Sequence, residues 1–325
     1  MRIKSSVVVV SVVVVTGIVV ASLLKLKLSA QKSEERTPQT AAKLADSRGP
    51  EGLDADLAQR LRVISSRAGG TVGVAVIHVE TGRLVSIEGA KPLPLYSVFK
   101  LPLAVTVLKN VEENRLLLEK RIRVAPEDVV PGSQFNLDLW RTPVERSVRE
   151  LLEVSIVRSD NTSSDKLLEL VGGPAAVTAR MRSMGFANID IHSSVRQYVA
   201  QRTNPNTGTA EDLSRLLAQL QTGNILGPAQ LEVLLGFMGR AMTGGARLRG
   251  TLPKDTPVAD KTGTGEAGSS TNDVGIITLP GGRGHLAMAV LISGSKLPAE
   301  EQEKLIAELA RAAYDAHVSP AADTK

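Results

Sequence analysis

The stretch 94–105 constrains the fold of this chain most, because it opens an apolar run with a serine three residues before a lysine. If the run is helical, Ser97 and Lys100 lie on one face, since positions i and i+3 are neighbours. Phe99 and residues 101–105 are apolar, which predicts a buried helix. The sequence therefore places a hydroxyl and an amine together at the start of a helix inside the protein.

Burial changes what this pair can do chemically. A dry environment disfavours the charged ammonium, so we expect a lowered pKa for Lys100. A neutral amine can take the proton of the neighbouring hydroxyl and make Ser97 a nucleophile. Unpaired N–H groups at the helix start favour developing negative charge. The alternative is an exposed helix start with an incidental serine and lysine, and the pair alone does not exclude it.

Residues 1–30 are expected to be a signal peptide or a membrane anchor. Arg2 and Lys4 precede an apolar run over residues 7–24, which is long enough to span a bilayer. Residues 31–51 are polar and aperiodic, which is typical of a flexible linker. We therefore expect an exported protein, periplasmic or extracellular, that is either released by cleavage or anchored by residues 7–24.

Composition excludes several classes of function. The net charge is +5, but the basic residues are scattered and not interleaved with aromatics, so nucleic acid is not an expected partner. The absence of cysteine removes thiol nucleophiles and thiolate metal sites. The four histidines lie far apart in the sequence without ligand spacing, so no metal or other cofactor is expected. We expect a monomer that acts on a small molecule.

The order of the predicted elements indicates an α/β (α+β) sandwich. A helix over 53–66 and a hairpin of 71–80 with 83–88 follow the linker. Three strands and a closing helix over 298–317 end the chain. We predict one five-stranded antiparallel sheet, flanked by helices, with an all-helical lobe inserted between its two halves. The late strands are predicted over 258–262, 273–279 and 285–292, and further helices over 144–157, 161–171, 175–184, 210–221 and 228–242.

Between these helices, residues 186–208 show no sustained period and are rich in small polar residues, Pro and Gly. A loop of this length in a folded domain is usually functional, so we expect an Ω-type loop. We also expect a small-molecule site in the cleft between the lobes. The expected catalytic domain covers 52–320, with an α/β lobe over 52–90 and 245–320, a helical lobe over 91–244, and a tail over 321–325.

Two further motifs make the serine–lysine pair part of a larger constellation. S-D-N at residues 159–161 lies between two predicted helices, and K-T-G at residues 261–263 ends a predicted strand. In this order S-x-x-K, S-D-N and K-T-G resemble the motifs of the class A β-lactamases and their penicillin-binding relatives. The resemblance extends from about Leu53 to His317. It implies a β-lactamase/transpeptidase-like fold and a serine hydrolase that opens the β-lactam amide.

The resemblance implies catalytic roles for four side chains. Ser97 would attack the lactam carbonyl and form an acyl-enzyme, while Lys100 would accept its proton. Ser159 would relay a proton to the leaving nitrogen, with Lys261 supplying positive charge beside it. The backbone N–H groups of Ser97 and Thr264 would form the oxyanion hole.

The resemblance also implies substrate-binding residues. The hydroxyls of Thr262 and Thr264 would hold the substrate carboxylate, with Gly263 between them. Many members add an arginine, whose fork suits a carboxylate. Arg247 and Arg249 are candidates, and Arg247 is favoured because it directly follows a glycine-rich turn.

The other two residues of S-D-N are expected to act differently. Asn161 would bind the amide of the substrate's acyl side chain and contact Lys100. Asp160 is expected to be a structural carboxylate that ties down its loop.

The chain departs from the class A pattern in its Ω-type loop. Class A enzymes carry there a glutamate that activates the deacylating water, and counting from both ends of the loop leads to Val195. Residues 191–208 contain no Asp or Glu, and the usual arginine–aspartate pair that closes the loop is not evident. Without this base we expect the ester to form but to turn over slowly.

Two arrangements would restore the missing base. The loop could bring one of the acids at its ends, Asp190 or Glu211, to the ester. Alternatively, a polar loop residue could orient a water molecule, the candidates being Tyr198, Gln197 and Gln201.

Three functions remain open at this point. The first is a serine β-lactamase-like hydrolase with impaired deacylation. The second is a D-Ala-D-Ala peptidase or penicillin-binding protein acting on peptidoglycan peptides, which would not need the loop glutamate. The third is a lactam-binding sensor that stays acylated, although the sequence shows no second transmembrane segment or output domain.

Overall fold

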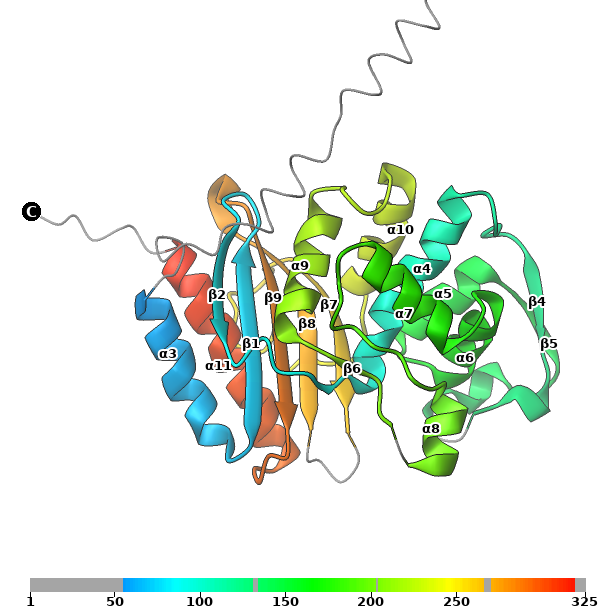
Figure 1. Cartoon of the computed structure of the whole chain (residues 1–325), viewed down its shortest axis with the longest axis horizontal. Helices are drawn as coiled ribbons and strands as arrows, with labels where there is room; N and C mark the ends of the chain where they lie inside the picture. The colour runs from blue at the N-terminus through cyan, green and yellow to red at the C-terminus, as the bar shows by residue number, and fades with distance from the viewer. Residues whose placement is uncertain (1–54, 131–133, 203, 266–269, 319–325) are drawn as a thin grey trace, which may run out of the picture. The chain divides into compact units, whose positions relative to one another are not determined.

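A computed structural model describes residues 55–130, 134–202, 204–265 and 270–318 of the protein. Within them, a five-stranded antiparallel sheet has the order β2-β1-β9-β8-β7 (Figure 1). Its strands are β1 (Thr71–His78), β2 (Arg83–Ile87), β7 (Val258–Thr264), β8 (Thr271–Thr278) and β9 (His285–Ser293). The early hairpin and the late strands thus join in one sheet, which confirms the predicted fold class.

The expected signal or anchor segment and the linker lie outside the described residues, as does the tail. In the part of the chain that the structure does describe, every helix is too short or too polar to cross a bilayer.

Both faces of the sheet are buried, because its strands alternate between two apolar cores. In β9, Met288 and Val290 face a core shared with α3 (Ala55–Ser65) and α11 (Ala299–Val318). Ala289 lies between them in sequence and faces the opposite core. On that side α9 (Ala210–Gln221) packs against the sheet, although it falls within the range expected for the helical lobe (Figure 1).

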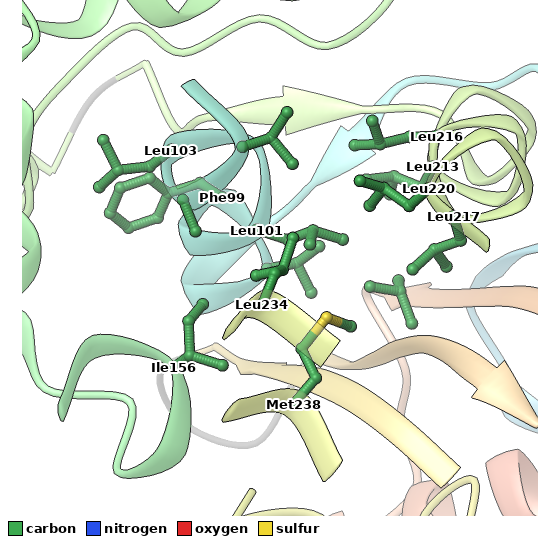
Figure 2. Packing of buried hydrophobic residues seen from close by; sticks show 14 of the residues in the cluster. Phe99, Leu101, Leu103, Ile156, Leu213, Leu216, Leu217, Leu220, Leu234 and Met238 are labelled. Carbon is green, nitrogen blue, oxygen red and sulfur yellow. The ribbon is translucent and has the colours of Figure 1, made fainter. Parts of the chain in front are cut away.

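Helix α4 (Lys100–Glu112) forms the centre of the second core. Its first nine residues, from Lys100 to Leu108, are all buried. Figure 2 shows Leu101 and its neighbours surrounded by side chains of α9, α10 and α5. The labelled partners are Ile156, Leu213, Leu216, Leu217, Leu220, Leu234 and Met238. The predicted serine–lysine stretch therefore begins the central helix of this core.

Most of the remaining helices pack against α4, one packs against α6, and short strand pairs lie among them. The helices are α5 (Val148–Val157), α6 (Asn161–Leu170), α7 (Pro174–Ser183), α8 (Val195–Gln201) and α10 (Pro228–Gly239). The strand pairs are β3 (Leu93–Pro94) with β6 (Thr207–Gly208), and β4 (Arg121–Val124) with β5 (Val144–Ser147).

The prediction of one helix over 144–157 is wrong at its start. Residues 144–147 form β5, which pairs with β4, and α5 begins only at Val148. The boundary is a capping box, in which the Ser147 side chain accepts the Glu150 N–H at 3.1 Å and Glu150 accepts the Ser147 N–H at 2.6 Å. The pairing partner and the cap together outweigh the helical periodicity of the segment.

The prediction that 186–208 lacks regular structure is also partly wrong, because α8 lies within it. Ser194 accepts the Gln197 N–H at 3.2 Å, and the Gln197 side chain accepts the Ser194 N–H at 2.9 Å. This S-x-x-Q capping box was a readable signal for a helix start. The helix is short, and its packing against α6 fixes it in place.

Candidate active site

Ser97 lies in a 3₁₀ turn, η3 (Tyr96–Phe99), that leads directly into α4, of which Lys100 is the first residue. Tyr96 has a φ of 46°, in the left-handed region that a non-glycine residue rarely adopts. Such strained positions cluster at active sites, where the surrounding packing holds them. Here the Tyr96 ring occupies the space beside Gly265, where a Cβ would lie 2.7 Å from a ring carbon.

The end of β7 packs closely against the backbone around this turn. A Cβ on Gly263 would lie 2.4 Å from the carbonyl oxygen of Leu95 and 3.2 Å from the Val98 nitrogen, so only glycine permits the approach. From β8, the Asn272 side chain donates to the carbonyl of Pro94 at 2.8 Å and to that of Leu95 at 3.2 Å. These contacts hold the K-T-G strand beside Ser97.

Lys100 is fully buried, and its ammonium is held by the S-D-N segment. Its Nζ donates to the Ser159 carbonyl at 2.6 Å, to Ser159 Oγ at 3.3 Å and to Asn161 Oδ1 at 2.8 Å. None of these bonds goes to Ser97. Burial lowers the pKa of Lys100 from 10.5 to about 8. A substantial neutral fraction is therefore available near neutral pH, as the burial of the helix predicted.

Ser159 connects the two buried lysines. Lys261 is 1% exposed, and its Nζ donates to Ser159 Oγ at 2.9 Å and to the Thr262 carbonyl at 2.9 Å. Burial, and then the nearby charge of Lys100, lower the pKa of Lys261 well below its usual value. Ser159 itself has a φ of 53°, so its hydroxyl is presented by a strained backbone.

Asp160 is structural, as expected. It caps α6, since its Oδ1 accepts the Ser163 N–H at 2.7 Å. Its Oδ2 also accepts the Trp140 indole N–H at 3.2 Å. The residue thus fixes the segment that presents Ser159 and Asn161.

Two buried carboxylates lie behind Lys261. Asp260 pairs with Arg249 at 2.5 Å, and Asp273 accepts the Leu248 N–H at 3.1 Å. Burial raises the pKa of Asp260 and raises that of Asp273 much further. When ionised, either carboxylate favours the protonated form of Lys261.

Arg247, not Arg249, contacts Gly263 and Thr264 at the end of β7. Its Nη2 donates to Thr264 Oγ1 at 2.7 Å, and its Nη1 donates to the Gly263 carbonyl at 3.1 Å. Arg249 is instead engaged by Asp260. Arg247 is thus the candidate that lies beside the Thr264 hydroxyl, and its role toward a substrate stays a prediction.

The Thr262 hydroxyl on the same strand also has a partner. Thr262 Oγ1 is 2.7 Å from Thr243 Oγ1, in the turn that precedes Arg247. Sequence reasoning missed Thr243, and no motif marks it, because only the folded turn brings it to K-T-G. The hydroxyls of Thr262 and Thr264 are therefore each oriented by a residue of one turn.

Several residues of the segments described above line a cavity of about 190 Å³. Its lining comprises Tyr96, Ser97, Phe99, Asn161, Ser194, Val195, Tyr198, Val199, Pro205, Asn206 and Thr264. Ser97, Asn161 of S-D-N and Thr264, which directly follows K-T-G, thus line one cavity, and Val195 borders it as the loop count predicted. Among the described residues, none of those that line it carries a carboxylate.

The α8 wall of the cavity is held by a carboxylate that sequence reasoning missed. Asp165 on α6 accepts the Val195 N–H at 2.8 Å through Oδ1 and the Arg196 N–H at 2.9 Å through Oδ2. It is 8% exposed, and burial raises its pKa. Its position four residues after Asn161, on the same helix face, was the only available signal.

The acids at the ends of the loop are engaged elsewhere. Asp190 pairs with Arg182 at 2.5 Å, an arginine–aspartate pair that the sequence did not reveal. Glu211 pairs with Arg215 at 2.9 Å and accepts the Ser86 hydroxyl at 2.9 Å. Neither acid lines the cavity, so neither takes the place of the missing base.

Of the three side chains named as candidates to orient water, Tyr198 alone borders the cavity. Tyr198 lines it, and its ring meets that of Tyr96 edge-on at 6.4 Å. Gln197 caps α8 instead, and Gln201 ends that helix without reaching the cavity lining.

Three histidines that are distant in sequence meet far from K-T-G, where β1, β9 and α11 come together. The rings of His78 and His317 stack with centroids 5.2 Å apart, and His285 Nδ1 lies 2.7 Å from Glu80. Within the described ranges, no group of three or more His, Asp or Glu side chains could hold a metal ion.

Known proteins resemble this chain over nearly all of the described region. The Beta-lactamase enzyme family matches residues 56–317. The extended-spectrum β-lactamase PER-1 of Pseudomonas aeruginosa is 34% identical over 264 residues, which are 78% of this chain and 83% of that protein. A solved β-lactamase from Chitinophaga pinensis DSM 2588 is 33% identical, with a TM-score of 0.77, over 80% of this chain and 99% of that one.

An ancestral class A β-lactamase, that of the last common ancestor of Gram-negative bacteria, is also similar in structure. It is 35% identical with a TM-score of 0.74, over 80% of this chain and 99% of that one. With the three motifs gathered at one cavity, these similarities are consistent across sequence, fold and site. The chain belongs to the β-lactamase enzyme family, as a serine β-lactamase-type hydrolase of the class A superfamily.

Proposed function

We propose that this enzyme opens the β-lactam amide through an ester on Ser97, and that this ester is hydrolysed slowly. The observation that carries the proposal is the contrast within one cavity. Ser97 and Asn161 line this cavity, and Ser159 receives hydrogen bonds from both buried lysines, whereas the facing wall carries Val195 and no carboxylate.

Acylation uses the two lysines in turn. Neutral Lys100 accepts the Ser97 proton as the hydroxyl oxygen attacks the lactam carbonyl. The backbone N–H groups of Ser97 and Thr264 stabilise the oxyanion, an effect worth about 3 kcal/mol per donor in comparable sites. The proton then passes through the Ser159 hydroxyl to the lactam nitrogen, while the charge of Lys261, 2.9 Å away, favours the relay.

The substrate carboxylate is bound on the K-T-G strand. Thr262 and Thr264 present hydroxyls there, and the guanidinium of Arg247 lies 2.7 Å from Thr264 Oγ1. The guanidinium of Arg247 is almost fully buried, so solvent screens it little, although Glu303 already accepts its Nε–H at 3.0 Å. This charge supports a substrate that carries a carboxylate next to its amide nitrogen.

Deacylation lacks a matching base. General-base assistance contributes about 10²–10⁴-fold to such steps. Asp165 on α6 uses both oxygens to accept backbone N–H groups of Val195 and Arg196, so it holds the loop, and it does not line the cavity. This arrangement supports a long-lived acyl-enzyme.

We also propose that the enzyme is exported, because residues 1–30 have the pattern of a signal peptide or anchor. We propose in addition that it acts as a monomer. Intact mass and light scattering of protein from fractionated cells check this. We expect one chain per particle, either shortened in the soluble exported fraction or full-length in the membrane. A full-length monomer in the cytoplasm, or a dimer, would contradict it.

Mixing the enzyme with a chromogenic cephalosporin should give a burst of about one product per enzyme followed by slow turnover. Intact-mass spectra should show one persistent adduct, and Ser97→Ala should show neither burst nor adduct. An adduct on that variant would overturn the nucleophile assignment. Fast steady turnover without a persistent adduct would overturn the proposal of slow hydrolysis.

The acylation rate constant at saturating lactam should depend on pH through Lys100. Neutral Lys100 is the active form and its pKa is about 8. The rate constant should therefore rise about tenfold per pH unit below about pH 8 and level off above it. Burst kinetics across this range provide the measurement, and a flat profile would argue against Lys100 as the base.

Val195→Glu should accelerate deacylation, by about 10²-fold or more if the new carboxylate reaches a water molecule. Val195→Gln is the matched control, because it has a similar size but no basic group. Adduct lifetime after removal of free lactam is the measurement. Equal lifetimes in the two folded variants would show that position 195 is not where a base is missing.

A further inference from the structure

We propose that Asn272 is a positioning residue for acylation, which holds the two backbone N–H groups of the expected oxyanion hole at the separation that the tetrahedral intermediate needs. The proposal rests on the Ser97 acyl-enzyme proposed above, and it adds a residue that none of the three motifs contains. Asn272 lies on β8, its side chain is fully buried, and it does not line the cavity. It therefore acts through its neighbours and not by touching substrate.

The Asn272 amide uses both its donor and its acceptor end. Its Nδ2 donates to the carbonyls of Pro94 at 2.8 Å and Leu95 at 3.2 Å. Its Oδ1 accepts the N–H of Ile292, in the neighbouring strand β9, at 3.0 Å. A primary amide carries two N–H donors, and both are engaged here. The backbone that leads to Ser97 is thereby attached to two inner strands of the sheet.

The bond to Leu95 supports the strained part of the turn. The Leu95 carbonyl belongs to the peptide group that precedes Tyr96, so its direction helps to set the φ of Tyr96. That φ is 46°, which a non-glycine residue rarely adopts without support from its surroundings. Asn272 opposes relaxation of this peptide group. It thus keeps in place the next peptide group, which carries the Ser97 N–H.

The same residue supports the second N–H group of the oxyanion hole. Asn272 pairs in register with Gly263 of β7, which directly precedes Thr264. Gly263 is in turn packed against the Leu95 carbonyl, since a Cβ there would lie 2.4 Å from that oxygen. One residue therefore contacts both backbone segments whose N–H groups, those of Ser97 and Thr264, must converge on one oxygen.

Binding of the substrate carboxylate does not depend on this side chain. Arg247 Nη1 donates to the main-chain carbonyls of Asn272 at 2.9 Å and Gly263 at 3.1 Å. Any residue at position 272 supplies the first of these carbonyls. Loss of the side chain should therefore slow the chemical step and leave binding of the intact lactam unchanged, because the oxyanion forms only in the transition state.

Two substitutions test this role. Asn272→Asp keeps the size of the side chain and the acceptor for Ile292, but it loses the two N–H donors. Asn272→Ala removes all three bonds. We expect each variant to lower the acylation rate constant at saturating lactam about 10²-fold. Burst kinetics over a range of lactam concentrations give this rate constant together with the dissociation constant, which should not change.

A boronic acid with an acylamino side chain provides a readout that a merely structural role would not move. It bonds to Ser97 Oγ and forms a tetrahedral adduct with an oxygen in the oxyanion hole, so its affinity should fall by the same factor as the acylation rate constant. Val85→Ala is the control for lost stability. Val85 is buried on β2, at the opposite edge of the sheet from β7, so this variant should lower only the melting temperature.

The outcomes separate the positioning role from the acyl-enzyme on which it rests. An adduct that forms at an unchanged rate in both Asn272 variants would overturn the role of Asn272 and leave the acyl-enzyme intact. A slower rate with unchanged boronic-acid affinity would also overturn it, as would the same losses in Val85→Ala. If the unsubstituted enzyme forms no adduct with any lactam, the acyl-enzyme is wrong, and the positioning role with it.

Discussion

Two buried ammonium groups that share one hydroxyl are the interaction on which this site depends. Lys100 and Lys261 are both removed from water, and each donates to Ser159 Oγ. Such an arrangement is costly unless hydrogen bonds and opposite charges offset the desolvation and the repulsion. The carboxylates of Asp260 and Asp273 lie behind Lys261, and burial lowers the pKa of both amines. The fold brings α4, the loop before α6 and strand β7 to one point, and that convergence buries both lysines and lowers their pKa values.

Much of this arrangement could be predicted from sequence because its signals are local. Alternation along β9, where Met288 and Ala289 face opposite cores, is readable in any strand buried on both faces. The apolar run after Ser97 marks a buried helix for the same reason. Each motif falls at the end of such an element, so placing the elements also places Ser97, Ser159 and Lys261. The loop position of Val195 followed from counting between two well-marked helix ends.

What the sequence could not supply depends on partners distant along the chain. Residues 144–147 are a strand only because Arg121–Val124 lies beside them. Asn272 supports the backbone before Ser97 through two carbonyls, and nothing in its own neighbourhood indicates that role. The hydrogen bonds from the first N–H groups of α8 to Asp165 likewise join segments distant in sequence; we call this contact the Asp165 clamp. These contacts join segments that meet only in three dimensions, so a reading based on local periodicity and spacing misses them.

The Asp165 clamp has an evolutionary consequence. It holds α8 through the main-chain N–H groups of Val195 and Arg196, and so does not depend on which side chain occupies position 195. A lineage can therefore exchange that side chain without rebuilding the loop around it. Under the proposed function, retention of an acyl group and its rapid release become neighbouring states on one scaffold, separated by a single codon and not by a change of fold.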